Sequence, residues 1–81
     1  MISLSIIVPV LDEEARIGAA LAALAPFRAR GAEVIVADGG SRDRSMEIAR
    51  PLADRVLVAP RGRGSQMNAG ATAASGDCTV W

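Results

Sequence analysis

Short runs of apolar, β-branched residues alternate with stretches of helical periodicity along the chain, and this alternation restricts the possible folds more than any other feature. The runs cover residues 4–8, 33–37 and 56–58, and an uninterrupted apolar run is typical of a strand buried on both faces. Strands separated by single helices form βαβ units, whose right-handed crossovers place helices on both faces of a parallel sheet. The sequence therefore predicts an α/β fold with a Rossmann-like parallel sheet.

Proline and acidic residues mark the expected ends of these elements. Pro9 should end the first strand, Asp12 should cap the first helix, and Pro26 should lie just beyond that helix. Pro51 should end the second helix near its last turn. The expected helices cover residues 13–25, 44–50 and 66–74, and a fourth strand is expected to begin at Cys78.

The composition excludes several classes of function. The 81 residues can form one small domain, and nine basic and nine acidic residues leave no net charge to attract nucleic acid or an anionic membrane. The chain has no histidine, the commonest metal ligand, and its single cysteine excludes an internal disulfide framework. The apolar segment 1–11 has no basic residue before it and is too short to span a bilayer, so a cytoplasmic location is expected.

The loops at the carboxyl ends of the predicted strands are where an open parallel sheet binds its ligands. The first of these loops is acidic, with Asp12, Glu13 and Glu14. A dinucleotide-binding enzyme would need a Gly-x-Gly-x-x-Gly loop here, so that the backbone could approach a pyrophosphate. The sequence thus argues against a hydride-transfer enzyme. The three carboxylates fit either a ligand site or the capping of the following helix.

The second and third loops carry one acid and two arginines. Asp38 directly follows a buried strand and precedes two glycines, so it can accept a hydrogen bond from a base or ribose, or close an Asx turn. Arg61 and Arg63 flank Gly62, and their guanidinium groups suit phosphate oxygens, although solvated surface arginines fit the same pattern. Asn68, near the start of the third helix, can bond a ligand or cap backbone groups.

Four segments, in order and at suitable spacing, resemble family 2 glycosyltransferases. Ser5-Ile-Ile-Val-Pro-Val-Leu-Asp-Glu-Glu14 resembles that family's first strand and loop, where Asn is usual at position 12. Val34-Ile-Val-Ala-Asp-Gly-Gly-Ser-Arg-Asp43 is similar to its second strand and Asp-Gly-Ser-x-Asp turn. Arg61-Gly-Arg-Gly-Ser-Gln-Met-Asn-Ala-Gly70 resembles its third block, and Ala74-Ser-Gly-Asp77 the segment leading to its fourth strand. The sequences of the second and third segments are most similar to a bacterial subset proposed to act in arsenosugar biosynthesis.

The resemblance implies a GT-A fold and a nucleoside-diphosphate sugar as the donor. Residues 1–81 would then be the nucleotide-sugar-binding N-terminal part of a glycosyltransferase domain. Pro9, Val10 and Glu14 would line the base and ribose pocket, and Asp38 would hold the base. The residues expected at the nucleotide are Pro9, Val10, Glu14, Asp38, Arg61, Arg63 and Asn68, with the two arginines near the base and the diphosphate.

The resemblance also implies Mg²⁺ or Mn²⁺, held by an Asp-x-Asp motif after the fourth strand, and a later carboxylate that acts as the base in a displacement with inversion. Asp77 precedes that strand and is not the motif, so no catalytic or metal-binding residue is assigned and the 81-residue chain is expected to be inactive. The expected partner is the sugar donor. The acceptor stays open, and the resemblance leaves room for peripheral membrane association of the full-length enzyme.

Two other interpretations stay open at this point. A nucleotide-binding module or a nucleotidyltransferase-like fragment would also build its site on such a sheet, although it would need a glycine-rich, basic first loop to hold a triphosphate. A structural fragment would bind nothing.

Overall fold

A four-stranded parallel sheet forms the centre of the molecule, with the strand order β3-β2-β1-β4. The computed structural model describes residues 4–74 and 77–80. The strands are β1 (Leu4–Val10), β2 (Glu33–Asp38), β3 (Arg55–Val58) and β4 (Asp77–Val80). The helices are α1 (Glu14–Ala29), α2 (Ser45–Ala49) and α3 (Arg63–Ala73), and the 3₁₀ turn η1 (Arg50–Leu52) follows α2. The predicted α/β fold with a Rossmann-like parallel sheet is confirmed.

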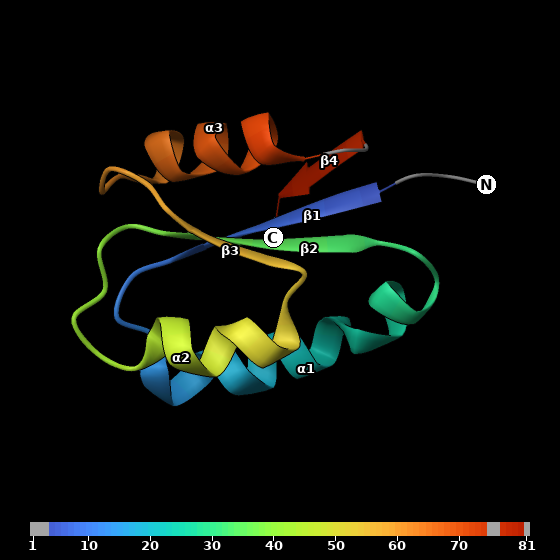
Figure 1. The fold of residues 1–81 in the computed structure, drawn as a ribbon, viewed down its shortest axis with the longest axis horizontal. Helices are drawn as coiled ribbons and strands as arrows, with labels where there is room; N and C mark the ends of the chain where they lie inside the picture. The colour runs from blue at the N-terminus through green and yellow to red at the C-terminus, as the bar shows by residue number, and fades with distance from the viewer. Residues whose placement is uncertain (1–3, 75–76, 81) are drawn as a thin grey trace.

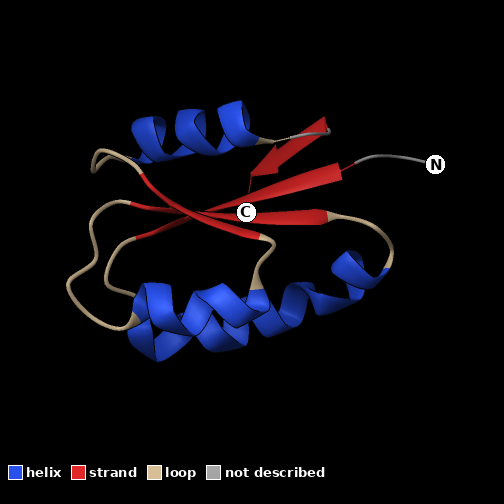
Figure 2. Cartoon of the chain, viewed as in Figure 1, coloured by secondary structure: helices blue, strands red, loops and turns tan. Residues whose placement is uncertain are grey.

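Helices cover both faces of the sheet, as Figures 1 and 2 show, with α1 and α2 on one face and α3 on the other. The main core lies between the sheet and the α1–α2 layer, because alternate residues of β1 and β2 point to that face. Its buried members are Ile6, Val8, Val10, Ile17, Leu21, Leu24, Val34, Val36, Ala49 and Ala53. Helix α3 approaches the opposite face so closely that a Cβ added at Gly70 would lie 2.5 Å from Cγ2 of Ile7.

Strand β1 continues through Pro9 to Val10, so the expected strand end at Pro9 is wrong. The backbone N–H of Gly39 donates to the carbonyl of Val10 at 2.9 Å, which shows that Val10 faces β2. The backbone nitrogen of Pro9 therefore faces the other side of the strand, where the described pairs with β4 end at Ile7. Proline costs no ladder hydrogen bond at such a position.

Helix α1 differs from the expectation at both ends. Asp12 does not cap it: Asp12 has φ +49°, the N-cap position is Glu13, and no side chain of its own caps the helix. Pro26 lies inside α1 rather than beyond it. The hydrogen bond that Pro26 cannot donate would have gone to the carbonyl of Ala22, and both residues are exposed, so water can serve that carbonyl.

Other boundaries shift by a few residues. α2 ends at Ala49 and Pro51 lies in η1, while α3 begins at Arg63, three residues earlier than expected. Asp77 is the first residue of β4 rather than a residue before it. None of the helices in the described part of the chain has the length and apolarity needed to cross a bilayer.

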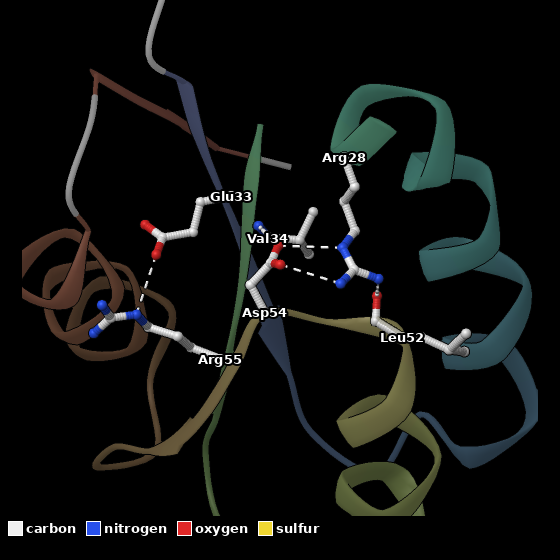
Figure 3. Close-up of polar contacts among 6 residues, drawn as sticks. All are labelled: Arg28, Glu33, Val34, Leu52, Asp54 and Arg55. Carbon is white, nitrogen blue, oxygen red and sulfur yellow. Dashed lines mark hydrogen bonds and ion pairs between the residues drawn. The ribbon is translucent and has the colours of Figure 1, made fainter. Parts of the chain in front are cut away.

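A cluster of polar contacts fixes the end of the sheet at which β2 begins (Figure 3). Asp54, between η1 and β3, forms a two-pronged ion pair with Arg28 of α1 and also accepts the backbone N–H of Val34 at 2.7 Å. Arg28 additionally donates to the carbonyl of Leu52. Burial raises the pKa of Asp54, but the Val34 N–H and the Arg28 guanidinium outweigh it, and the net result is a lowered pKa.

Candidate functional site

The loops that follow β1, β2 and β3 lie together at one end of the sheet, on the left in Figure 1. Two hydrogen bonds join these strand ends directly. Gly39 N–H donates to Val10 O at 2.9 Å, and Ala59 N–H donates to Asp38 O at 2.8 Å. The prediction that Asp38 and the 60–66 loop share one edge of the sheet is therefore confirmed.

The acidic first loop is bonded to the second loop by reciprocal hydrogen bonds. Asp12 donates its backbone N–H to Ser41 Oγ and accepts the backbone N–H of Arg42, both at 2.8 Å. Two residues after Asp12, Oε1 of Glu14 accepts the backbone N–H of Arg44 at 2.8 Å. Two of the three carboxylates of the first loop thus hold the second loop in place.

Residues of the second loop also cap α1 from outside its own sequence. Glu13 N–H donates to Ser45 Oγ at 2.8 Å, and Glu14 N–H donates to Oδ2 of Asp43 at 3.0 Å. These bonds satisfy N–H groups that a helix start leaves without an intrahelical partner. Hydrogen bonds from the Ser45 hydroxyl, and from backbone N–H groups, lower the pKa of Asp43 in spite of an opposing effect of burial. The carboxylate is therefore kept charged at the helix N-terminus, where negative charge is favourable.

Asp38 closes the turn after β2 with its own side chain. Its Oδ2 accepts the backbone N–H groups of Gly40 at 2.9 Å and Ser41 at 2.7 Å, and its Oδ1 accepts the Ser41 hydroxyl. The residue is 0% exposed. Of the two roles that the sequence left open for Asp38, the structure shows the turn.

Gln66 ties the three strand ends together. Its Nε2 donates to the carbonyls of Val10 and Ala37, each at 2.9 Å, and its Oε1 accepts the backbone N–H of Gly62 at 3.2 Å. The side chain packs against Gly39, where any Cβ would lie 2.8 Å from Oε1. One buried amide therefore sets the relative positions of the loops after β1, β2 and β3.

Two open cavities lie on either side of the last residues of β1. The first, of about 200 Å³, is lined by Pro9, Val10, Leu11, Glu13, Arg63 and Gln66. The second, of about 270 Å³, lies between β1 and α1 and is lined by Val8, Pro9, Val10, Glu13, Arg16, Ile17 and Ala20. Each is smaller than a typical pocket for a complete cofactor, of about 300–1,000 Å³. Pro9, Val10 and Glu13 border both, so together they could hold a ligand with two different parts.

The structure brings together some of the expected site residues and leaves others apart. Pro9, Val10 and Arg63 line the first cavity. Glu14 and Asp38 are bonded to backbone groups of the second loop and line neither cavity. Arg61, in the loop after β3, and Asn68, in the middle of α3, are exposed and do not line either cavity.

Glu13 and Gln66 lie at the cavities but were not on the list of expected contacts. Glu13 borders both cavities, while the sequence interpretation chose Glu14, one residue further along. Gln66 lines the first cavity although only 5% of the residue is exposed. The position of Gln66 directly after the third loop could have indicated that it belongs to the site. Within the described residues no group of three or more His, Cys, Asp or Glu side chains could hold a metal ion.

The comparison with protein families shows which family the chain belongs to. The model of glycosyl transferase family 2 matches residues 5–81. The chain belongs to glycosyl transferase family 2. Its fold is that of the N-terminal portion of a GT-A glycosyltransferase. The comparison with curated proteins gave no match.

A comparison with solved structures found one that is similar over almost the whole chain. It is glucosyl-3-phosphoglycerate synthase from Mycobacterium tuberculosis, in complex with Mn²⁺, UDP and glucosyl-3-phosphoglycerate. The TM-score is 0.82 at 26% sequence identity, and the match covers 96% of this chain and 33% of the synthase. The family 2 chain described here thus spans about a third of that enzyme's length.

Proposed function

We propose that this chain forms the nucleotide-binding part of a glycosyltransferase that uses a nucleoside-diphosphate sugar as its donor. The observation that carries the proposal is the cavity at the end of β1, which combines an apolar wall at Pro9 and Val10, the carboxylate of Glu13 and the guanidinium of Arg63. These groups suit the three parts of a nucleotide: a flat base, ribose hydroxyls and a charged diphosphate. The UDP bound by the mycobacterial synthase supports the choice of ligand class.

The ribose hydroxyls are assigned to Glu13 rather than to Glu14. Glu13 borders both cavities, whereas one carboxylate oxygen of Glu14 is engaged by the N–H of Arg44. A carboxylate beside the base pocket can accept hydrogen bonds from both hydroxyls of a ribose. In this proposal Glu14 and Asp38 serve the site by shaping the first two loops.

The diphosphate is assigned to the start of α3. Arg63 lines the cavity and is the first residue of that helix, and Arg61 lies two residues before it in the loop. Exposed guanidinium groups at a helix N-terminus are favourable partners for phosphate oxygens. Asn68 is exposed one turn further along α3 and can donate to the same ligand from its side-chain amide.

We assign no residue of this chain as a ligand of the divalent metal that the family uses. When bound, Mg²⁺ or Mn²⁺ neutralises charge on a leaving diphosphate. The described residues offer no acidic cluster that fits such an ion, so none of them is proposed as its ligand. Transfer with inversion, the base that activates the acceptor and the acceptor itself stay predictions from the resemblance. So do the arsenosugar connection, the bacterial origin and peripheral membrane association of the full-length enzyme. The cytoplasmic location stays a prediction from the sequence of residues 1–11.

Calorimetric titration of the chain with uridine and with UDP tests the proposal. Arg63→Ala should weaken the affinity for UDP by about tenfold and leave that for uridine nearly unchanged, because a charge-assisted bond to phosphate is worth about 1.5–3 kcal/mol. Arg30→Ala, an equally exposed arginine at the other end of the sheet, is the matched control and should change neither affinity. Tighter binding of UTP than of UDP would instead favour the nucleotidyltransferase alternative, and no binding of any of these ligands would overturn the proposal.

A further inference from the structure

The side-chain amide of Gln66 has a fixed orientation inside the first cavity. Both carbonyl oxygens within reach of Nε2, those of Val10 and Ala37, require a donor at that position. The N–H of Gly62 requires an acceptor at Oε1. A flipped amide would place oxygen against two carbonyls, so the hydrogen-bond network assigns the two ends of the amide without ambiguity.

The remaining hydrogen-bonding capacity of Gln66 can be counted. The two hydrogens of Nε2 are both donated, while Oε1 has two lone pairs and uses one of them for Gly62. Gln66 can therefore accept one further hydrogen bond and cannot donate any. Gln66 lines the cavity and only 5% of the residue is exposed, so its amide is largely shielded from water.

We infer that Gln66 determines base specificity, by accepting a hydrogen bond from a ring N–H of the nucleobase. This inference rests on the proposed function. Uracil fits, because its N3–H is a donor that can reach Oε1 of Gln66 in the cavity. Cytosine does not fit, because its N3 is an acceptor and would face Oε1 without a hydrogen between them. A buried pair of acceptors carries a desolvation penalty that the correct base avoids.

Two neighbouring residues support the assignment to Gln66. Asp38 was expected to hold the base, but it is 0% exposed and its carboxylate already accepts three hydrogen bonds in its own turn. Gly39, the next residue, has no side chain, and a Cβ there would collide with the Gln66 amide. The acceptor at this point of the cavity therefore comes from α3 and not from the loop after β2.

Titration of the wild-type chain with UDP, CDP and N3-methyl-UDP tests the inference. UDP should bind at least about tenfold more tightly than either of the other two, which lack the N3–H donor. Gln66→Met keeps the length of the side chain without the acceptor, so the preference for UDP should disappear. The ratio of affinities is the informative quantity, because a general loss of stability would weaken all three ligands alike.

The outcomes separate the two proposals. Equal binding of UDP, CDP and N3-methyl-UDP by the wild type would overturn the role of Gln66 and leave nucleotide binding intact. A preference for UDP that persists in Gln66→Met would overturn it as well. Absence of binding for all three would show that the proposed function itself is wrong. If Gln66→Met does not fold, equal binding of the three ligands by the wild-type chain would still overturn the inference.

Discussion

Gln66 occupies the space beside Gly39 in which a side chain on residue 39 would lie, since a Cβ built there would be 2.8 Å from Oε1 of Gln66. Gly39→Ala should therefore displace the amide and lower the free energy of unfolding by about 1–3 kcal/mol. Urea denaturation of the two single variants and of Gly39→Ala/Gln66→Ala measures the coupling between the residues. We expect the alanine at 39 to cost much less once Gln66 is truncated.

Gly64→Ala is the matched control for that series. Gly64 lies in α3 near Gln66, but a Cβ added to it meets nothing within 4 Å. Alanine there should be neutral or should stabilise the chain by about 0.5–1 kcal/mol, because glycine is a poor residue for a helix interior. Additive effects of the changes at 39 and 66 would contradict the contact between them.

Gly70 permits the close packing of α3 against β1. Gly70→Ala would place its Cβ 2.5 Å from Cγ2 of Ile7 and 3.1 Å from Cγ1, so we expect a loss of about 1–3 kcal/mol in the free energy of unfolding. Ile7→Ala removes both of those carbon atoms and should itself cost about 2–5 kcal/mol. In the double variant the two losses should be clearly less than additive. A Gly70→Ala variant as stable as wild type would show that α3 lies further from the sheet.

Asp38 is expected to stabilise the fold rather than to contact a ligand directly. Asp38→Ala removes a fully buried side chain that accepts three hydrogen bonds, and we expect a loss of about 2–4 kcal/mol in the free energy of unfolding. Glu47→Ala, at an exposed position of α2, should change it by less than about 0.5 kcal/mol. A stable Asp38→Ala variant with impaired UDP binding would instead return Asp38 to the role of direct ligand contact.

Acid should weaken the contact cluster of Figure 3 through Asp54. The folded-state pKa of Asp54 is lowered below its ordinary value of 3.8, so its stabilising effect is present above that value and is lost as the pH falls through the folded-state pKa. The Arg28 and Asp54 side chains are 31% and 35% exposed, so solvent screens the pair and its ion-pair contribution should not exceed about 1 kcal/mol.

Unfolding curves at pH 6 and pH 3 test this effect by comparing wild type with Asp54→Asn. The neutral amide cannot titrate, so the variant should be less stable than wild type at pH 6, and the two should approach each other at pH 3. An equal difference at both pH values would contradict a lowered pKa for Asp54.

Much of the fold could be predicted from the sequence because local runs of apolar residues indicate which strands are buried. The runs at 4–8 and 33–37 are apolar on both alternating faces, and a parallel sheet is what makes that pattern favourable. The ends of elements were harder, since they depend on partners distant in sequence. Pro9 and Pro26 were expected to end a strand and a helix, but each lies where the folded chain tolerates the missing N–H.

The location of the site could also be predicted, whereas the role of each side chain in it could not. Asp12 was expected to cap the first helix, but its carboxylate accepts the N–H of Arg42, and the N–H of Glu14 at that helix start is accepted by Asp43, some thirty positions away. Such contacts require the sheet to bring two loops together, and no local pattern encodes them. Gln66 was underestimated for the same reason, because its three bonds reach β1, β2 and the loop after β3.

Mapping of UDP binding by NMR chemical shifts on the ¹⁵N-labelled chain tests the central claim most directly. If the cavity at the end of β1 holds the nucleotide, the largest shifts should occur at the backbone N–H groups of Leu11, Glu13, Arg63 and Gln66. Those of Arg28, Val34 and Asp54, at the opposite end of the sheet, should stay in place. Saturable shifts confined to the first group are the predicted result. Shifts centred on the second group, or none at millimolar UDP, would contradict the proposal that this edge of the sheet binds a nucleoside diphosphate.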